Sequence, residues 1–306
     1  GAGDFNRNAT IPQTIYHMDG TFTVARVPPL SRTYTIEAGT EFLAFDTDAE
    51  IHVDGILVAD AEGEETITFS DGTTNGWCGI YFDTWSFGVF NNVKVSEVTS
   101  NGCPAIDIFC LRGAVDLTDV EVCDNEDEGI YVHGEAEAFI EFSDIHDNSY
   151  GIEIGDQSFV IIENSSITNS ENDGIYFYGG SDLEMIGTWM DSNEDDGIYV
   201  KDADPGDVDL FEVRSRENGV DETNSAGIYL KNAYVYIDDT DNDGDESLID
   251  NNFQYGIYLD PESVIDMNED ADGHTQISGN ASACIYSMVD PLDWDNYGLS
   301  DSEDGH

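Results

Sequence analysis

Positively charged residues are scarce in this sequence. Its 306 residues include 9 Lys+Arg against 66 Asp+Glu, and the formal net charge is −57. Proteins that bind nucleic acids present basic faces to the phosphates, and docking on an anionic membrane surface needs basic residues as well. The composition therefore excludes a nucleic-acid-binding protein and argues against a protein of the membrane surface.

Long apolar runs and helical periodicity are also missing. A membrane-spanning helix needs about 20 consecutive apolar residues, and because no such run occurs we predict no membrane span. Hydrophobic residues nevertheless make up 40% of the chain, with 15 Tyr and 15 Phe. Disordered chains are poor in aromatic residues, so we expect this chain to fold.

A short motif, Gly-Ile-Tyr followed by an apolar residue, recurs along the chain with variations. Its isoleucines are spaced by 22 to 30 residues. They are Ile80, Ile106, Ile130, Ile152, Ile175, Ile198, Ile228, Ile257 and Ile285. An asparagine lies shortly before each one: Asn75, Asn101, Asn125, Asn148, Asn169, Asn193, Asn224, Asn252 and Asn280. A fixed period of this length is the signature of a solenoid.

The repeats consist of strands. Apolar residues alternate with period two, as at Val93 and Val95 or at Val115 and Leu117, which is the pattern of half-buried strands. Units of this length with two or three short strands predict an all-β fold, a right-handed parallel β-helix of about ten coils over residues 33–286. We expect the repeat isoleucines to form one inward column and the asparagines to form a hydrogen-bonded ladder.

The sequence also resembles a known family, the parallel β-helix repeat proteins of the pectate-lyase-like group. Within that group it is similar to secreted acidic surface proteins of bacteria and archaea. The motifs that carry the resemblance are I-E-A-G-T at 36–40, I-T-F-S at 67–70 and W-C-G-I at 77–80. The resemblance implies the fold and leaves the function open, because one fold hosts many functions.

The two ends of the chain differ from the acidic body. Residues 1–32 hold two acids, three arginines and three of the seven prolines. We expect them to form either a cap on the first coil or an arm that docks head to tail on another copy of the chain and builds a filament. Residues 287–306 are expected to form an acidic tail or cap.

One group of residues suggests catalysis. In enzymes of the resembled fold, the active site lies on the outer face of the sheet that holds the repeat isoleucines. A uronan lyase needs a proton acceptor and a cation for the substrate carboxylate. The outward residues that meet this need are Tyr199, Lys201, Tyr229, Lys231 and Asp260. A tyrosine column also simply covers a sheet, and the segment 260–262 lacks the His of the Asp-Pro-His epimerase motif, so the sequence favours a role other than catalysis.

Two acidic loops have the spacing of calcium-binding loops. The first places Asp239, Asp241, Asp243 and Asp250 at positions 1, 3, 5 and 12, with a glycine at position 6. Carboxylates at this spacing surround Ca²⁺ in EF-hand-like loops. A second copy lacks the twelfth ligand and contains Asn268, Asp270 and Asp272. We therefore predict Ca²⁺ as a ligand, with a solvated acidic turn as the alternative for each loop.

A pair of acidic residues poses an electrostatic question. Asp173 and Asp196 each lie two residues before a repeat isoleucine, in adjacent coils. Two like charges at such a short distance repel each other. We expect either a cation between the two carboxylates or side chains that splay into solvent.

The five cysteines contain no C-x-x-C zinc pattern. Four of them lie within residues 78–123, which fits disulfides in an exported protein. Cys78 and Cys103 precede their repeat isoleucines at similar distances in adjacent coils, so we predict a disulfide between them. Cys110 and Cys123 remain as a second candidate pair. Cys284 lies among apolar residues and is expected to be a buried free thiol.

These observations predict an extracellular or cell-surface protein. A strongly acidic body needs screening by cations or salt, which favours a marine or halophilic setting. The main interpretation is a calcium-stabilised structural or adhesive subunit of a surface filament, whose partners are copies of itself and possible surface glycans. The alternative is a β-helix module that binds or cleaves polysaccharide.

Overall fold

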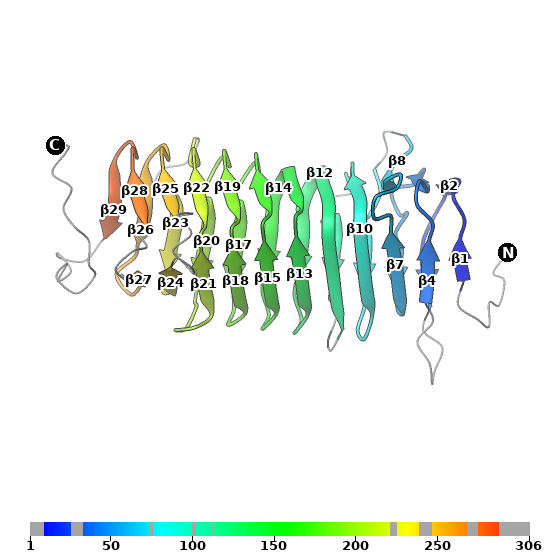
Figure 1. The fold of residues 1–306 in the computed structure, drawn as a ribbon, viewed down its shortest axis with the longest axis horizontal. Helices are drawn as coiled ribbons and strands as arrows, with labels where there is room; N and C mark the ends of the chain where they lie inside the picture. The colour runs from blue at the N-terminus through cyan, green and yellow to red at the C-terminus, as the bar shows by residue number, and fades with distance from the viewer. Residues whose placement is uncertain are drawn as a thin grey trace.

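The structure is a computed structural model and describes residues 9–25, 33–73, 76–99, 102–109, 111, 113–220, 225–238, 247–267 and 275–287. Within these ranges every regular element is a β-strand. The strands stack along one long axis from the N-terminal to the C-terminal end (Figure 1). No helix in the described ranges is long and apolar enough to cross a membrane.

Three strand columns, called faces I, II and III, run along this axis, and all pairings between neighbouring coils are parallel. Three long strands continue from one face to the next: β10 (Phe87–Ser96), β12 (Ala114–Val132) and β14 (Asp144–Ile154). The predicted all-β parallel solenoid of about ten coils is therefore confirmed.

Face I is formed by the first strand of each coil. Besides parts of β10 and β12, it contains β1 (Ala9–Ile11), β4 (Thr33–Ile36), β7 (Ile56–Asp60), β13 (Glu137–Glu141), β15 (Phe159–Glu163), β18 (Asp182–Ile186), β21 (Val208–Phe211), β24 (Tyr234–Asp238) and β27 (Val264–Met267).

Face II follows in each coil. Besides parts of β10, β12 and β14, it contains β2 (Ile15–Met18), β5 (Glu41–Ala44), β8 (Ile67–Asp71), β16 (Ser166–Thr168), β19 (Trp189–Asp191), β22 (Arg214–Arg216), β25 (Leu248–Asp250) and β28 (Gln276–Ser278).

Face III holds the repeat isoleucines. Besides the ends of β12 and β14, it contains β3 (Phe22–Val24), β6 (Ile51–Val53), β9 (Ile80–Phe82), β11 (Ile106–Ile108), β17 (Ile175–Tyr178), β20 (Ile198–Lys201), β23 (Ala226–Lys231), β26 (Tyr255–Leu259) and β29 (Ala283–Ser287).

The N-terminal segment forms a coil of the solenoid. Residues 9–25 form β1, β2 and β3, which pair in parallel with β4, β5 and β6 of the next coil. The β-helix thus begins one coil before residue 33, the start that the sequence predicts. The strands at 9–25 are too short and too divergent from the Gly-Ile-Tyr motif to be recognised as a coil from sequence alone.

The interior is filled by columns of apolar side chains. The repeat isoleucines from Ile80 to Ile257 are at most 1% exposed, and Ile285 packs on the core while remaining partly exposed. This confirms the predicted inward column. Burial of each such side chain stabilises the fold by roughly 1.5–3 kcal/mol.

An amide ladder runs beside the isoleucine column. The Asn125 Nδ2 donates to Asn148 Oδ1 at 2.7 Å. Further along, the Asn193 Nδ2 donates to Asn218 Oδ1 at 3.0 Å, and the ladder continues through Asn252 and Asn280. The side-chain oxygens also accept backbone N–H groups of the preceding coil, as Asn218 Oδ1 does from Asn193 N.

The glycine of the Gly-Ile-Tyr motif makes room for this ladder. A Cβ atom at Gly174 would lie 2.6 Å from Asn193 Nδ2. The same close approach occurs at Gly129, Gly197, Gly227 and Gly256. The repeated glycine and the repeated asparagine are therefore two parts of one contact between neighbouring coils.

At several positions the ladder residue is not the asparagine that the sequence predicts. Ser170 replaces an amide between Asn148 and Asn193, and Asn169 lies beside it in a left-handed turn with φ of 55°. Asn218 occupies the ladder position of its coil. The expected Asn75, Asn101 and Asn224 lie outside the described residues.

The cysteines follow the sequence prediction in part. Cys78 and Cys103 form the predicted disulfide. Cys123 is a buried free thiol, so the suggested pairing with Cys110 is wrong; its sulfur faces Glu121, and Cys110 lies outside the described residues. Cys284 is free but exposed instead of buried, because it belongs to β29, the last described strand of face III.

Replacement of Ser170 by Asn is expected to stabilise the protein. The Ser170 hydroxyl is buried and has no hydrogen-bond partner among the described residues, and an amide there would connect Asn148 with Asn193. One net hydrogen bond contributes about 1 kcal/mol to the free energy of unfolding. Urea denaturation should show this gain for Ser170→Asn. The matched variant Asn218→Ser, which creates the same gap elsewhere, should lose about 2 kcal/mol. A destabilised Ser170→Asn would contradict the ladder.

Candidate active site

The outer side of face III carries a stack of tyrosine rings. Ring centroids are 5.2 Å apart between Tyr176 and Tyr199, 5.0 Å between Tyr199 and Tyr229, and 4.6 Å between Tyr229 and Tyr258. Tyr286 continues the stack at 5.0 Å. Because neighbouring rings cover each other's faces, this part of the column is a packed ladder along the sheet.

The tyrosines of the sequence-predicted constellation are poor proton acceptors. Burial and neighbouring phenols raise the pKa of Tyr199, and burial likewise raises the pKa of Tyr229 to about 12. Both hydroxyls therefore remain protonated near neutral pH. Asp260 is engaged in a turn, where it accepts hydrogen bonds from Ser263 Oγ at 2.6 Å and from Asn232 N at 3.1 Å.

The two lysines of that constellation lie as predicted. Lys201 and Lys231 are register partners at the ends of β20 and β23. Lys201 is half-buried and Lys231 is exposed. In the part of the chain that the structure describes, neither ammonium group forms an ion pair, whereas Lys94 and Arg216 each bind a carboxylate. The lysines thus offer positive charge on the outer side of face III.

A group of acid–base side chains lies next to these lysines, in the middle of the solenoid. The His133 Nε2 is 2.8 Å from Asp107 Oδ1 in the preceding coil. The ring of Tyr131 stacks on the His133 imidazole with centroids 4.0 Å apart. The Tyr131 hydroxyl is hydrogen-bonded to the Tyr178 hydroxyl at 2.9 Å. We call His133, Asp107, Tyr131, Tyr178 and Glu153 the His133 cluster.

A glycine allows Tyr178 to reach this cluster. Gly155 follows β14 in the coil between those of Tyr131 and Tyr178. A Cβ atom at Gly155 would lie 2.3 Å from Tyr178 Cζ, so any larger residue would displace the ring. The Tyr178 side chain therefore lies across the intervening coil, and its hydroxyl reaches both Tyr131 and Glu153.

Burial and neighbouring carboxylates raise the pKa values of acidic groups in and beside the cluster. Burial raises the pKa of Tyr178, and the hydrogen bonds to Tyr131 and Glu153 add to this effect. Burial also raises the pKa of Glu153, and it raises the pKa of Glu128 to about 8, with further repulsion from Asp127 and Glu153. The cluster therefore contains a protonated phenol at Tyr178 and an imidazole oriented by Asp107.

Sequence reasoning did not assemble this cluster. All its members are outward residues of face III, but they belong to different positions of the repeat, and only the reach of Tyr178 over Gly155 brings them together. The interruption of the tyrosine column at Asp107 and Glu153 is the signal that could have identified the region.

The acidic pair of face III is buried. Asp173 is 5% exposed and Asp196 is 2% exposed, so neither splays into solvent. The Asp173 Oδ1 accepts the backbone N–H of Asp196 at 3.0 Å, and Asp196 Oδ1 accepts that of Ala226 at 2.6 Å. Each carboxylate thereby joins its own coil to the next. A cation beside them stays a prediction.

Most of the predicted calcium ligands cannot be placed. Asp250 lies in β25 and is bonded to Asn251 through Oδ2, while its Oδ1 is buried and has no hydrogen-bond partner among the described residues. The other ligands lie outside the described residues: Asp239, Asp241, Asp243, Asn268, Asp270 and Asp272. Calcium binding by these loops stays a prediction.

Comparison with known families agrees with this architecture. Residues 105–270 match the family model described as right-handed β-helix region. The chain belongs to this family. The handedness of the predicted solenoid is thereby confirmed. No curated protein sequence matches the chain at a significant level.

Solved structures share the β-helix fold at low sequence identity. A mutant of the periplasmic alginate epimerase AlgG is 14% identical, with a TM-score of 0.53, and the alignment covers 94% of this chain and 77% of that chain. The A-module of the Azotobacter vinelandii mannuronan C-5 epimerase AlgE6 is 10% identical, with a TM-score of 0.44 and coverage of 94% and 92%. At 14% identity the likeness to the AlgG mutant concerns the fold alone.

Replacement of Glu128 by Gln should change how stability depends on pH. The folded protein holds the Glu128 proton up to about pH 8, while the ordinary pKa is 4.5. The contribution of Glu128 to the free energy of unfolding is therefore fully present below pH 4.5, and it is lost as pH rises towards 8. The variant lacks this loss and should exceed the wild type by about 1–2 kcal/mol above pH 8, after allowance for solvent screening. Thermal melts at pH 5 and pH 8.5 measure the difference, and the exposed variant Glu126→Gln should show none. Parallel pH profiles for wild type and Glu128→Gln would contradict the raised pKa.

Proposed function

We propose that this chain is a polysaccharide-modifying β-helix module that moves a proton on an acidic sugar. The observation that carries the proposal is the position of two lysines that form no ion pair among the described residues. Tyr178 of the His133 cluster pairs in register with Lys201, and Lys201 pairs with Lys231. Proton-transferring groups and free positive charge thus lie in consecutive coils of one exposed sheet.

The spacing of this face suits a sugar chain. Neighbouring coils are roughly 4.8 Å apart, and a sugar residue in an extended polysaccharide spans a similar length. A polymer that lies along the solenoid axis would place successive residues over successive coils. A carboxylate of one residue near Lys201 would then put its neighbour over the His133 cluster.

The charged and acid–base side chains of this face suit removal of a proton next to a carboxylate. The hydrogen on the carbon next to a carboxylate is hard to remove, because the resulting carbanion adds to the negative charge. Lys201 would bind the carboxylate of the neighbouring sugar residue, hold the polymer in place and lower the cost of the developing negative charge. His133, oriented by Asp107, would accept the proton. Tyr178, held protonated, would return a proton either to the same carbon or to the oxygen of a leaving sugar.

The large negative charge of the chain opposes the approach of an acidic polymer. The net charge of −57 acts over the whole surface, but salt limits its range to about 8–10 Å. At shorter range Lys201 and Lys231 supply local positive charge. We therefore expect binding of an acidic polysaccharide to strengthen as salt rises from low ionic strength.

Two further observations support a secreted polysaccharide-modifying protein. The Cys78–Cys103 disulfide is typical of oxidising compartments outside the cytoplasm. The fold is compatible with such chemistry, since by its name AlgG is a periplasmic alginate epimerase. The extracellular location and the marine or halophilic setting are proposals on this basis.

Assembly into a filament stays a second proposal. Residues 9–25 are paired with the next coil of their own chain, so this part cannot serve as a docking arm while that pairing holds. Head-to-tail association would have to use the ends of the stack, where strand edges invite pairing.

Hydrogen exchange at the substrate tests the proposed function. The full chain is incubated in D₂O with alginate, polygalacturonate or neutral dextran, and NMR detects deuterium at the carbon next to the carboxylate. We expect exchange with an acidic polymer and none with dextran. His133→Gln, Tyr178→Phe and Lys201→Met should each lower the rate by about 100-fold or more.

Matched variants on other faces serve as controls. Tyr234→Phe removes a phenol that donates to Asp266 on face I, and Lys94→Met removes a lysine of face II. Both should retain the wild-type exchange rate. Binding of an acidic polymer with neither exchange nor chain cleavage would leave a binding module and overturn the acid–base assignment. The absence of binding, exchange and cleavage would overturn the proposal.

A further inference from the structure

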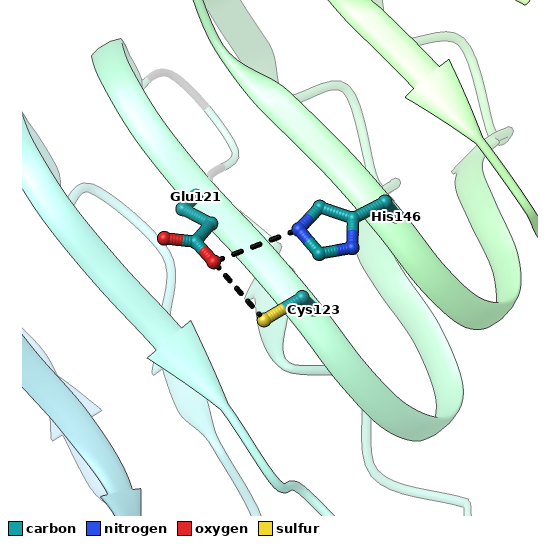
Figure 2. Close-up of side chains that lie close together, drawn as sticks. All are labelled: Glu121, Cys123 and His146. Carbon is teal, nitrogen blue, oxygen red and sulfur yellow. Dashed lines mark hydrogen bonds and ion pairs between the residues drawn. The ribbon is translucent and has the colours of Figure 1, made fainter.

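A second group of reactive side chains lies on face II, away from the His133 cluster. Glu121 and Cys123 belong to β12, and His146 belongs to β14 of the next coil. Cys123 and His146 are direct register partners. Figure 2 shows the three side chains converging, with one oxygen of the Glu121 carboxylate facing both the thiol and the imidazole. The carboxylate, thiol and imidazole come from two adjacent coils.

The two distances from the Glu121 carboxylate to the other groups match those around a tetrahedral metal ion. The Glu121 Oε1 is 3.5 Å from Cys123 Sγ and 3.5 Å from His146 Nε2. One ligand atom of each residue lies within 4.8 Å of the other two. Metal bonds of about 2.0–2.3 Å at tetrahedral angles require ligand atoms about 3.3–3.6 Å apart. An ion therefore fits between these atoms with little movement of the side chains.

A separate contact with Asp147 orients the His146 imidazole for metal binding. The His146 Nδ1 lies 2.6 Å from Asp147 Oδ2. Histidines that ligate metals commonly donate the second ring N–H to a carboxylate, which fixes the tautomer and the ring orientation. When the Nδ1–H group of His146 donates to Asp147, the ring presents its Nε2 to Glu121 and Cys123.

The surroundings of Cys123 protect its sulfur. By the alternation of β12 the side chain points outward, yet Cys123 is fully buried. Burial raises the pKa of Cys123 to about 12, although Lys94 acts in the opposite direction, so the group is a thiol in the metal-free protein. A bound metal ion deprotonates a coordinating thiol.

The ammonium group of Lys94 already pairs with the Glu121 carboxylate. The Lys94 Nζ forms an ion pair with Glu121 Oε1 at 2.6 Å, from the preceding coil of face II. The carboxylate therefore attracts positive charge at this point, and a divalent ion would compete with the ammonium group for the same oxygen.

We propose that Glu121, Cys123 and His146 bind Zn²⁺ or a similar divalent transition metal ion that links two adjacent coils. Thiolate and imidazole ligands select such ions over Ca²⁺. Three protein ligands leave the fourth position to water. Binding releases the thiol proton and displaces Lys94 from Glu121. This site is separate from the predicted calcium loops and from the His133 cluster.

Titration of the full, untagged chain with Co²⁺ tests the site, because Co²⁺ bound to a thiolate has an intense near-ultraviolet charge-transfer band. We expect one equivalent to produce the band and Zn²⁺ to remove it. Cys123→Ser should abolish the band, and Cys284→Ser, which removes the other described free thiol, should leave it intact. A band that persists in Cys123→Ser, or that never forms in the wild type, would overturn the proposal.

Two further variants keep the result independent of any effect of Cys123→Ser on folding. His146→Gln should weaken Co²⁺ binding at least tenfold, as expected for loss of a ligand, whereas His52→Gln, on face III, should not. Lys94→Met should strengthen binding by about fivefold or more, because a competing positive charge is removed. Unchanged affinity in His146→Gln or in Lys94→Met would place the ion elsewhere and overturn the ligand set.

Discussion

Each side chain of this solenoid lies beside the residue at the same position one coil away, because parallel strands pair in register at roughly 4.8 Å. Columns of like residues are stable when like residues attract. Isoleucines exclude water together, amides hydrogen-bond to amides, and phenol rings stack. Carboxylates repel, so an acidic chain with this fold must give its stacked acids other partners. Asp173 and Asp196 do so by accepting backbone N–H groups of the following coil.

Chemistry appears where the columns change residue type. On face III the tyrosine column gives way to Asp107 and Glu153, and there His133 and Tyr178 find different partners instead of copies of themselves. On face II, Cys123 lies between Ser96 and His146 in the register. A regular column provides stiffness, and a break in it supplies the mixture of donors and acceptors that a reaction or an ion requires.

The features predicted correctly from sequence depend on spacing alone. The isoleucine column, most of the amide ladder and the Cys78–Cys103 disulfide follow once the coil length is known. The ladder prediction failed in the irregular units. Loops of different length conceal which polar residue is in register, so Ser170 and Asn218 were missed.

Other features depend on the shape of side chains in three dimensions. The reach of Tyr178 across Gly155 and the approach of His146 to Cys123 have no counterpart in a repeat pattern. They need the height of one coil, the direction of a side chain and the space left by a missing Cβ atom. The first coil at 9–25 was hidden for a different reason, since its strands lack the repeat motif.

The Cys78–Cys103 bond joins two adjacent coils near the N-terminal third of the solenoid. Coils of a solenoid contact only their immediate neighbours, so such molecules lose structure from their ends. The last described coil is the less protected end, because no side chain within residues 275–287 is buried, whereas Met18 and Val24 of the first described coil are. Fraying would advance from the C-terminal end, one coil after another, past both reactive clusters before it met the covalent bond. Amide hydrogen exchange in this protein would then follow a gradient along the axis, with the slowest exchange near the disulfide.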